Sequence, residues 1–161
     1  MSDKLDKLDY KILKMLQKNS KITNLELSKT IGLSPAPTLE RVKKLENNGV
    51  IESYHASVSL EALGLGVRTF VLVSLAWNKP NALNNFLEKI NKIKEITECF
   101  IITGEADVLM KIVCKDLPSY EKLIFKTMSQ IDEIERIKTL MTLSTVKESR
   151  VLPFDYESEE Q

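Results

Sequence analysis

Residues 33–49 constrain the fold of this chain more than any other stretch, because they hold the start, the body and the end of one helix. Ser34 can accept a hydrogen bond from a free amide at the helix start, and Pro35 suits the first helical position, where no N–H is needed. Asn48-Gly49 indicates the end, because glycine readily adopts the left-handed conformation just beyond a helix. The stretch therefore predicts one well-bounded helix.

The pattern within this helix predicts a buried side and a cationic side. Three apolar residues recur at every third position and are expected to face the core: Leu39, Val42 and Leu45. Arg41, Lys43 and Lys44 fall mostly off that side. Arg41 can pair with guanine or a phosphate, and the two lysines can contact a DNA backbone. An ordinary solvated helical face remains the other interpretation of the charge.

Two capped helices are predicted before this one. Apolar residues between Leu5 and Leu16 follow a helical period, with Asp6 or a neighbour as the expected cap. The sequence Thr23-Asn24-Leu25-Glu26 matches a capping box, and Gly32 closes the short helix that follows it. Three helices, the last two joined by a short turn that contains glycine, are typical of a helix-turn-helix.

After residue 50 the hydrophobic period changes to two. Alternating apolar side chains between Val50 and Val58 predict one or two short strands, which would form a wing beside the three helices. The two glycines within residues 61–66 make this stretch the best linker candidate, so a domain boundary is expected there.

The remainder of the chain alternates strands and helices. The predicted order is strand, helix, strand, strand, helix, strand, at residues 70–77, 83–93, 96–103, 108–114, 117–131 and 134–146. This β-α-β-β-α-β order is the ferredoxin-like arrangement, so the whole chain is expected to be α+β. The helices can cover only one face of such a sheet. Because several strands are apolar on both faces, the other face is expected to contact a second copy of the chain.

Composition and charge exclude several classes of protein. The net charge of the 161 residues is +0, although residues 1–60 carry +3 and residues 61–161 carry −3. A modestly basic module joined to an acidic one is therefore predicted. No run approaches the ~18 apolar residues of a membrane span, and the charged N-terminus is unlike a signal peptide. Cys99 and Cys114 lack metal-ligand spacing and are expected to be free thiols in a reducing cytosol.

The predicted hairpin at residues 103–107 is a second candidate site. Gly104 permits a tight turn whose backbone amides can bind a carboxylate, while Glu105 and Asp107 can bind an ammonium group. Glycine and acidic residues are also ordinary hairpin chemistry, so the residues alone leave both interpretations open. Catalysis finds little support, because His55 is the only histidine and no phosphate-binding glycine loop is present.

Several short motifs taken together resemble one family. They are Leu5-Asp6 with Asp9 and Ile12-Leu13; Leu27-Ser28; Gly32-Leu33-Ser34-Pro35 with Pro37; Arg41-Val42 with Leu45-Glu46; Gly49-Val50-Ile51 with Tyr54; Glu98-Cys99; Thr103-Gly104 with Asp107; and Val146-Lys147. With them the chain resembles the Lrp/AsnC (feast/famine) transcriptional regulators, particularly the leucine-responsive regulatory protein branch. Each motif is weak alone, and the combination is highly specific.

This resemblance implies a winged helix-turn-helix that binds double-stranded DNA. The implied contacts are Ser34, Pro35, Pro37, Thr38, Arg41, Lys43 and Lys44. It also implies a homodimer formed by the ferredoxin-like domain and a higher assembly, a tetramer or an octamer. An amino-acid effector is implied between dimers, near the hairpin residues Thr103, Gly104, Glu105, Ala106 and Asp107.

We therefore expect a cytoplasmic, sequence-specific transcriptional regulator that responds to an amino acid, needs no metal or cofactor, and is not an enzyme. The expected parts are a DNA-binding domain at 1–60, a linker at 61–66, an effector and dimerisation domain at 67–150, and a C-terminal tail at 151–161. The acidic tail is expected to be disordered after Pro153.

Two alternatives remain at this point. A ligand-independent architectural protein that wraps or bridges DNA is favoured by one departure: the family commonly has Gly-Asp-aromatic-Asp where this chain has Gly-Glu-Ala-Asp. A regulatory subunit of a metabolic enzyme would use the second domain as an amino-acid sensor, and the complete helix-turn-helix argues against it.

Overall fold

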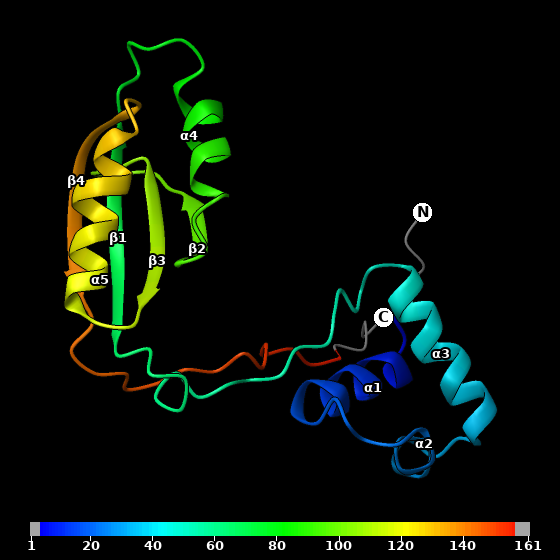
Figure 1. The fold of residues 1–161 in the computed structure, drawn as a ribbon. Helices are drawn as coiled ribbons and strands as arrows, with labels where there is room; N and C mark the ends of the chain where they lie inside the picture. The colour runs from blue at the N-terminus through cyan, green and yellow to red at the C-terminus, as the bar shows by residue number, and fades with distance from the viewer. Residues whose placement is uncertain (1–3, 157–161) are drawn as a thin grey trace. The chain divides into compact units, whose positions relative to one another are not determined.

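The computed structural model describes residues 4–156, and the chain forms two compact units. The first unit contains the residues up to Ser57 together with the segment that starts at Lys147. The second unit is Val58–Val146. The chain therefore passes between the units twice, once in each direction. Figure 1 shows the helices of the first unit and the sheet of the second.

Three helices build the first unit: α1 (Lys7–Lys18), α2 (Asn24–Ile31) and α3 (Pro35–Asn47). The predicted caps are present, because Asp6 and Asp9 form a capping box on α1, and Thr23 and Glu26 form another on α2. Gly32 ends α2 with a φ of 78°, in the left-handed region that favours glycine. Buried apolar residues from all three helices form the core of this unit: Ile12, Leu27, Ile31 and Leu45.

The prediction of wing strands was wrong. The described residues between α3 and the first strand of the second unit contain no β-ladder. A strand needs a partner that receives its backbone hydrogen bonds, and no such ladder is formed by residues 50–58. A side chain fastens it to α3 instead, because the Tyr54 hydroxyl donates to Oε1 of Glu46 at 2.8 Å. Burial and this hydrogen bond raise the pKa of Tyr54 to about 12.

The second unit confirms the predicted strand and helix order. Its elements are β1 (Val67–Leu75), α4 (Ala82–Ile90), β2 (Ile96–Ile101), β3 (Val108–Cys114), α5 (Leu117–Lys122), η1 (Leu123–Thr127), η2 (Met128–Gln130) and β4 (Ile134–Met141). The strands form one antiparallel sheet in the order β2-β3-β1-β4, which leaves β2 and β4 at the edges. Two predicted elements differ most in extent. The last strand ends at Met141, and the second helix becomes a π-helical turn and a 3₁₀ turn after Lys122.

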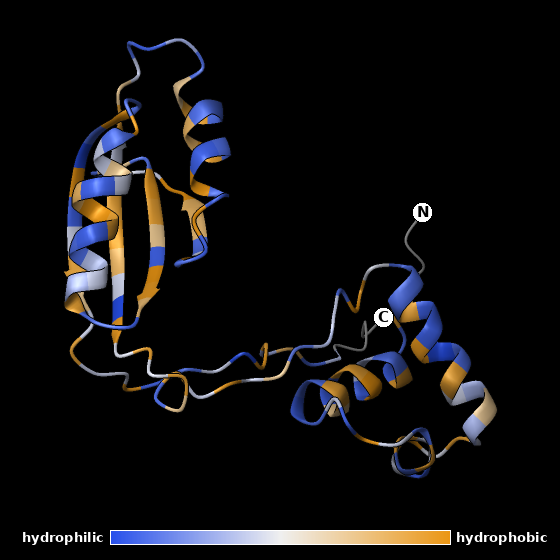
Figure 2. Cartoon of the chain, in the orientation of Figure 1, coloured by the Kyte–Doolittle hydropathy of each residue, from blue (hydrophilic) through white to orange (hydrophobic). Residues whose placement is uncertain are grey.

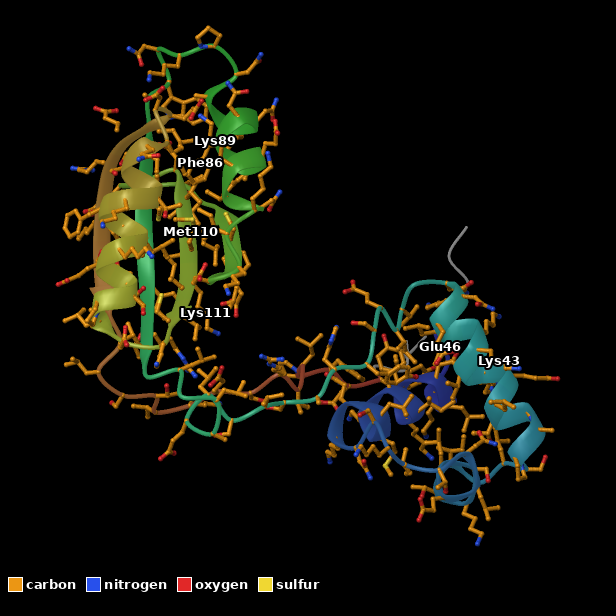
Figure 3. All side chains as sticks on the ribbon, in the orientation of Figure 1. Lys43, Glu46, Phe86, Lys89, Met110 and Lys111 are labelled. Carbon is orange, nitrogen blue, oxygen red and sulfur yellow. The ribbon has the colours of Figure 1, made fainter. Side chains whose placement is uncertain are left out.

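Alternate side chains of the sheet form the core of the second unit. Val71, Val73 and Leu75 of β1 are buried against Phe86 of α4 and Met110 of β3. Figure 2 shows the orange, hydrophobic strands beside helices that carry both hydrophilic and hydrophobic residues, and Figure 3 labels Phe86 and Met110. The other face of the sheet has no helix of this unit over it, since the intervening residues of β1 stay partly exposed.

The C-terminal segment differs from the expected disordered tail. Phe154 and Tyr156 both contact the ring of Tyr10 on α1, so the expectation was wrong for these residues. An acidic tail beginning with a Phe-Asp-Tyr sequence still carries aromatic surface that can be buried on a neighbouring helix. The remaining acidic residues, 157–161, lie outside the described part of the chain.

Candidate DNA-binding surface and effector pocket

The orientation of α3 decides which of its residues can reach a ligand. Leu45 is buried and Val42 is half-buried, as predicted, but Leu39 is 43% exposed. Thr38 takes the buried position instead, with 0% exposure, and its hydroxyl donates to the backbone oxygen of Ser34 at 2.9 Å. The implied DNA contact by Thr38 is therefore corrected, because its side chain is enclosed in the helical core.

Arg41 is engaged inside the protein. Its Nη1 lies 2.7 Å from a carboxylate oxygen of Asp6 and 2.8 Å from one of Asp9. Hydrogen bonds to Asp9, and then to Asp6, raise the pKa of the Arg41 guanidinium against the effect of burial. Both acids belong to the capping box that starts α1. Arg41 therefore links α3 to α1 through both acids.

The outer side of α3 combines one predicted contact with residues that the sequence motifs did not include. Lys43, which was predicted, and Ala36, Glu40 and Asn47, which were not, are exposed and recur at helical spacing opposite Thr38 and Leu45. Figure 3 shows Lys43 on this helix. Exposed Leu39 and Lys44 flank them. Thr38, Val42 and Leu45 follow a helical period as well as Leu39, Val42 and Leu45 do. Choosing Thr38 as the first buried residue would have predicted the outer side correctly.

The N-terminus of α3 offers few amides to an anion. Ser34, Pro35 and Pro37 are exposed there, but neither proline has an N–H, and the Thr38 amide already donates to Ser34 at 3.3 Å. Ser34 occupies the cap position without a side-chain hydrogen bond to the helix. Asn24 donates to the Pro35 oxygen at 2.8 Å and ties this end to α2. Any grip on a phosphate there depends mainly on side chains.

The hairpin acid Asp107 is occupied by structural hydrogen bonds. One of its carboxylate oxygens accepts from the Leu75 amide at 2.7 Å, and the other accepts from the Trp77 indole at 3.0 Å. Its own amide donates to Val73 at 3.0 Å. Both carboxylate oxygens of Asp107 are thus already used to hold the hairpin against the end of β1.

A pocket of about 300 Å³ lies beside this hairpin. Its lining comes from β1, from β4 and from two hairpin residues: Leu72, Ser74, Glu105, Ala106, Arg136, Ile137 and Lys138. Arg136 Nη2 donates to the Glu105 backbone oxygen at 3.3 Å, and Lys138 Nζ lies 3.7 Å from Glu105 Oε2. Two cations and one carboxylate around an apolar wall match the carboxylate and ammonium groups of a free amino acid.

The sequence motifs located only part of this pocket. Of the predicted effector residues, Glu105 and Ala106 line it, whereas Thr103, Gly104 and Asp107 do not. Arg136 and Lys138 were missed, because their place beside the hairpin follows from the antiparallel pairing of β4 with β1, which joins Ser74 to Arg136 and Leu72 to Lys138. The sequence did hold one indication, because Arg136 and Lys138 alternate in the last predicted strand and therefore lie on the same face.

Comparison with known proteins agrees with this pairing of a helical unit and a pocketed sheet. A family model described as the Lrp/AsnC ligand binding domain matches residues 68–152, and a winged helix-turn-helix DNA-binding model matches residues 5–52. The chain belongs to the Lrp/AsnC family. It is a DNA-binding transcriptional regulator with a ligand-binding domain, and its relatives are regulators and not enzymes.

Individual Lrp/AsnC proteins match over nearly their whole length. A leucine-responsive regulatory protein from Haemophilus influenzae is 38% identical over 92% of this chain and 89% of its own. The transcriptional regulator AzlB from Bacillus subtilis is 38% identical over 94% and 96%. A transcriptional regulator from Neisseria meningitidis, solved as an L-Met complex, has a TM-score of 0.90 at 34% identity, covering 93% and 97% of the two chains.

Within residues 4–156, no three potential metal ligands come together, and no helix has both the length and the hydropathy to cross a membrane. The thiols of Cys99 and Cys114 are both free, and burial raises the pKa of each.

Proposed function

We propose that this protein is a cytoplasmic, sequence-specific regulator whose DNA binding and assembly respond to an amino acid bound beside the Gly104 hairpin. The proposal rests chiefly on the pocket there. Arg136 and Lys138 would pair with the ligand carboxylate, Glu105 with its ammonium group, and the wall formed by Leu72 with its side chain. The L-Met complex of the N. meningitidis relative supports the same ligand class.

We assign DNA contact to the outer side of α3. Lys43 would contact a phosphate, and Glu40 and Asn47 are placed to reach base edges, Asn47 as a partner for adenine and Glu40 for cytosine. Exposed Leu39 would lie against a thymine methyl group. Ser34, Pro35, Pro37 and Lys44 stay in the proposed contact surface because they are exposed around this side.

The open face of the sheet would pair two copies of the chain. Phe100 is 50% exposed and Leu140 is 43% exposed, and partly exposed Phe70 and Leu109 lie between them in the register of the sheet. An apolar face of this kind is buried most simply by a second copy. A ligand between such dimers would favour one assembly, tetramer or octamer, and so change how many α3 helices engage neighbouring DNA sites.

The DNA surface predicts different effects for two exposed lysines. Lys43→Ala should weaken binding to a labelled duplex, selected by the wild-type protein from random sequences, about tenfold at fixed salt. The slope of log affinity against log salt should fall by about one for each subunit engaged. Lys92→Ala, on the second unit, should change neither quantity. Equal salt slopes for wild type and Lys43→Ala would remove Lys43 from the phosphate contacts.

The pocket predicts a selective loss of ligand affinity. For an amino acid that stabilises the wild-type protein, Arg136→Gln should lower the binding affinity about ten- to a hundredfold. The reason is the loss of one charge-assisted hydrogen bond. A thermal-shift screen of the twenty amino acids identifies that ligand, since a ligand must stabilise the state it binds. Lys122→Gln, an exposed cation on α5, is the matched control. Arg136→Gln binding as tightly as wild type would contradict the assigned pocket.

The architectural alternative has one observation in its favour. Ala106 leaves one side of the pocket without the aromatic group common in the family. A ligand-independent DNA binder would show no stabilisation by any of the twenty amino acids, and would bind the selected duplex only a few times more tightly than random DNA. Specific regulators prefer their sites by roughly 10³-fold or more.

A further inference from the structure

The C-terminal segment packs on a helix that is remote from it in sequence. The Leu152 amide donates to Oε1 of Gln17 at 2.7 Å. Asp155 forms an ion pair with Lys14. These bonds join positions 135 and 141 residues apart, so they are tertiary contacts and not a continuation of local structure. We call residues 152–156 the strap.

Aromatic rings complete this contact. The Tyr10 ring meets Phe154 with centroids 5.7 Å apart and planes at 73°, and it meets Tyr156 at 5.5 Å and 71°. Both are edge-to-face geometries, which aromatic pairs prefer. Tyr10 therefore receives two rings of the strap.

One side of α1 carries the three side chains that bond to the strap or stack against it. Tyr10, Lys14 and Gln17 follow each other by four and three residues, the spacing that places side chains on one side of a helix. The buried Ile12 belongs to the other side, against the core of this unit. The strap therefore occupies a surface of α1 that the three-helix core leaves free.

The strap is docked without being tightly packed. A cavity of about 790 Å³ lies among α1, residues 50–57 and residues 150–154, with Leu13, Leu16 and Phe154 in its walls. Gln17 Nε2, next to the bond from Leu152, is buried without a hydrogen-bond partner among the described residues. Protein cores are normally close-packed, so a contact beside such a void is weaker than one inside a core. Release of the strap should therefore be accessible to the folded protein.

The strap is also the direct continuation of β4. Arg136 and Lys138, which line the proposed effector pocket, lie on β4. Beyond its end, the Thr142 amide and the Thr145 hydroxyl both bond to Arg68, at 3.1 and 3.0 Å. Only six residues then separate Thr145 from Leu152, and the seven steps between them span roughly 25 Å at most when fully extended. A short piece of chain thus joins β4 directly to the strap.

We propose that the strap is a docked tether: it holds α1 of the DNA-binding unit and carries the ligand response from β4 to that unit. This inference rests on the proposed amino-acid response. Binding at Arg136 and Lys138 would shift the end of β4, and the short connection would pull the strap on or off α1. A movement of α1 would then act on α3 through the ion pairs of Arg41 with Asp6 and Asp9.

Hydrogen exchange in the full-length protein tests docking without any ligand. In the wild type, the Leu152 amide should be protected by its bond to Gln17. The double variant Phe154→Ala, Tyr156→Ala should exchange it about tenfold faster, because both edge-to-face contacts are lost. Val146→Ala, at a position 96% exposed in the same connection, should leave the exchange rate unchanged. Equal Leu152 exchange in the wild type and the double variant overturns the docked strap.

A slackened connection tests transmission. Four Gly/Ser residues inserted after Val146 should leave Leu152 protected but bring the ratio of DNA affinities, with and without L-leucine or L-methionine, close to one. An unchanged ratio overturns the transmitting role. If no amino acid alters DNA binding of the wild type, the proposed response and the transmitting role both fail, and Leu152 exchange still decides whether the strap is docked.

Discussion

Replacing Asp107 with alanine is expected to lower the free energy of unfolding of the second unit by about 2–3 kcal/mol. The Leu75 amide and the Trp77 indole would both lose a charged acceptor, and Leu75 is only 1% exposed, so water replaces that acceptor poorly. Urea denaturation followed by tryptophan fluorescence measures the loss directly, because Trp77 is the only tryptophan.

The matched control for this prediction is the neighbouring hairpin acid. The Glu105 side chain is 85% exposed and pairs with Lys138 at 3.7 Å, so Glu105→Ala should change the same free energy by less than about 0.5 kcal/mol. Equal urea midpoints for Asp107→Ala and the wild type would show that the hydrogen bonds of Asp107 do not stabilise the hairpin. Because Asp107 also holds the hairpin, a lost ligand response in Asp107→Ala identifies a ligand contact only if the urea midpoint is unchanged.

Arg41→Ala is expected to destabilise the helical unit by about 1–2 kcal/mol, between the values for exposed and buried ion pairs. The guanidinium is one-third exposed and joins two acids of α1, which would be left close together without a cation. Amide exchange within α1 measures the effect in the intact chain. Lys43→Ala, on the solvent side of α3, should leave that exchange unchanged.

DNA binding separates a positioning role for Arg41 from a contact role. If Arg41 only positions α3, Arg41→Ala lowers affinity without changing the salt slope, whereas Lys43→Ala lowers both. A reduced salt slope in Arg41→Ala would instead return Arg41 to the phosphate contacts.

The pH dependence of Arg41→Ala follows from Asp6. Burial acts to raise the pKa of Asp6, but hydrogen bonds from the Asp9 amide and from Arg41 outweigh it and lower the pKa below the ordinary 3.8. A lowered folded pKa contributes stability above pH 3.8 that is lost as the pH falls through the folded value. The difference between wild type and Arg41→Ala should therefore be full at neutral pH and shrink below about pH 4.

Local sequence correctly predicted the elements whose hydrogen bonds and backbone conformations are completed by residues close in the chain. The capping boxes at Asp6 and Thr23 supply acceptors to free amides within three residues, so their effect does not depend on the rest of the fold. Gly32 likewise ends α2 through its own backbone freedom. The strand and helix order of the second unit followed from hydrophobic periods that a sheet with one covered face requires.

Features that depend on a remote partner were predicted poorly. The segment around Tyr54 has a strand-like pattern, but no neighbouring strand completes its backbone hydrogen bonds. Thr38 and Leu39 are adjacent in sequence, and only packing against α1 and α2 decided which one is buried. The same arrangement places Asp6 and Asp9 beside Arg41, and so changes a candidate DNA contact into a link between helices.

The sequence alone determined that this chain joins a helix-turn-helix to a β-α-β-β-α-β sheet, because caps, glycine turns and hydrophobic periods act over a few residues. The tertiary structure decided which side of α3 faces outward, which cations line the pocket beside Gly104, and where the C-terminal segment lies. Each of these depends on pairs of residues far apart in the chain. Arg136 meets Glu105 across 31 positions and Leu152 meets Gln17 across 135, and no local pattern records such pairings.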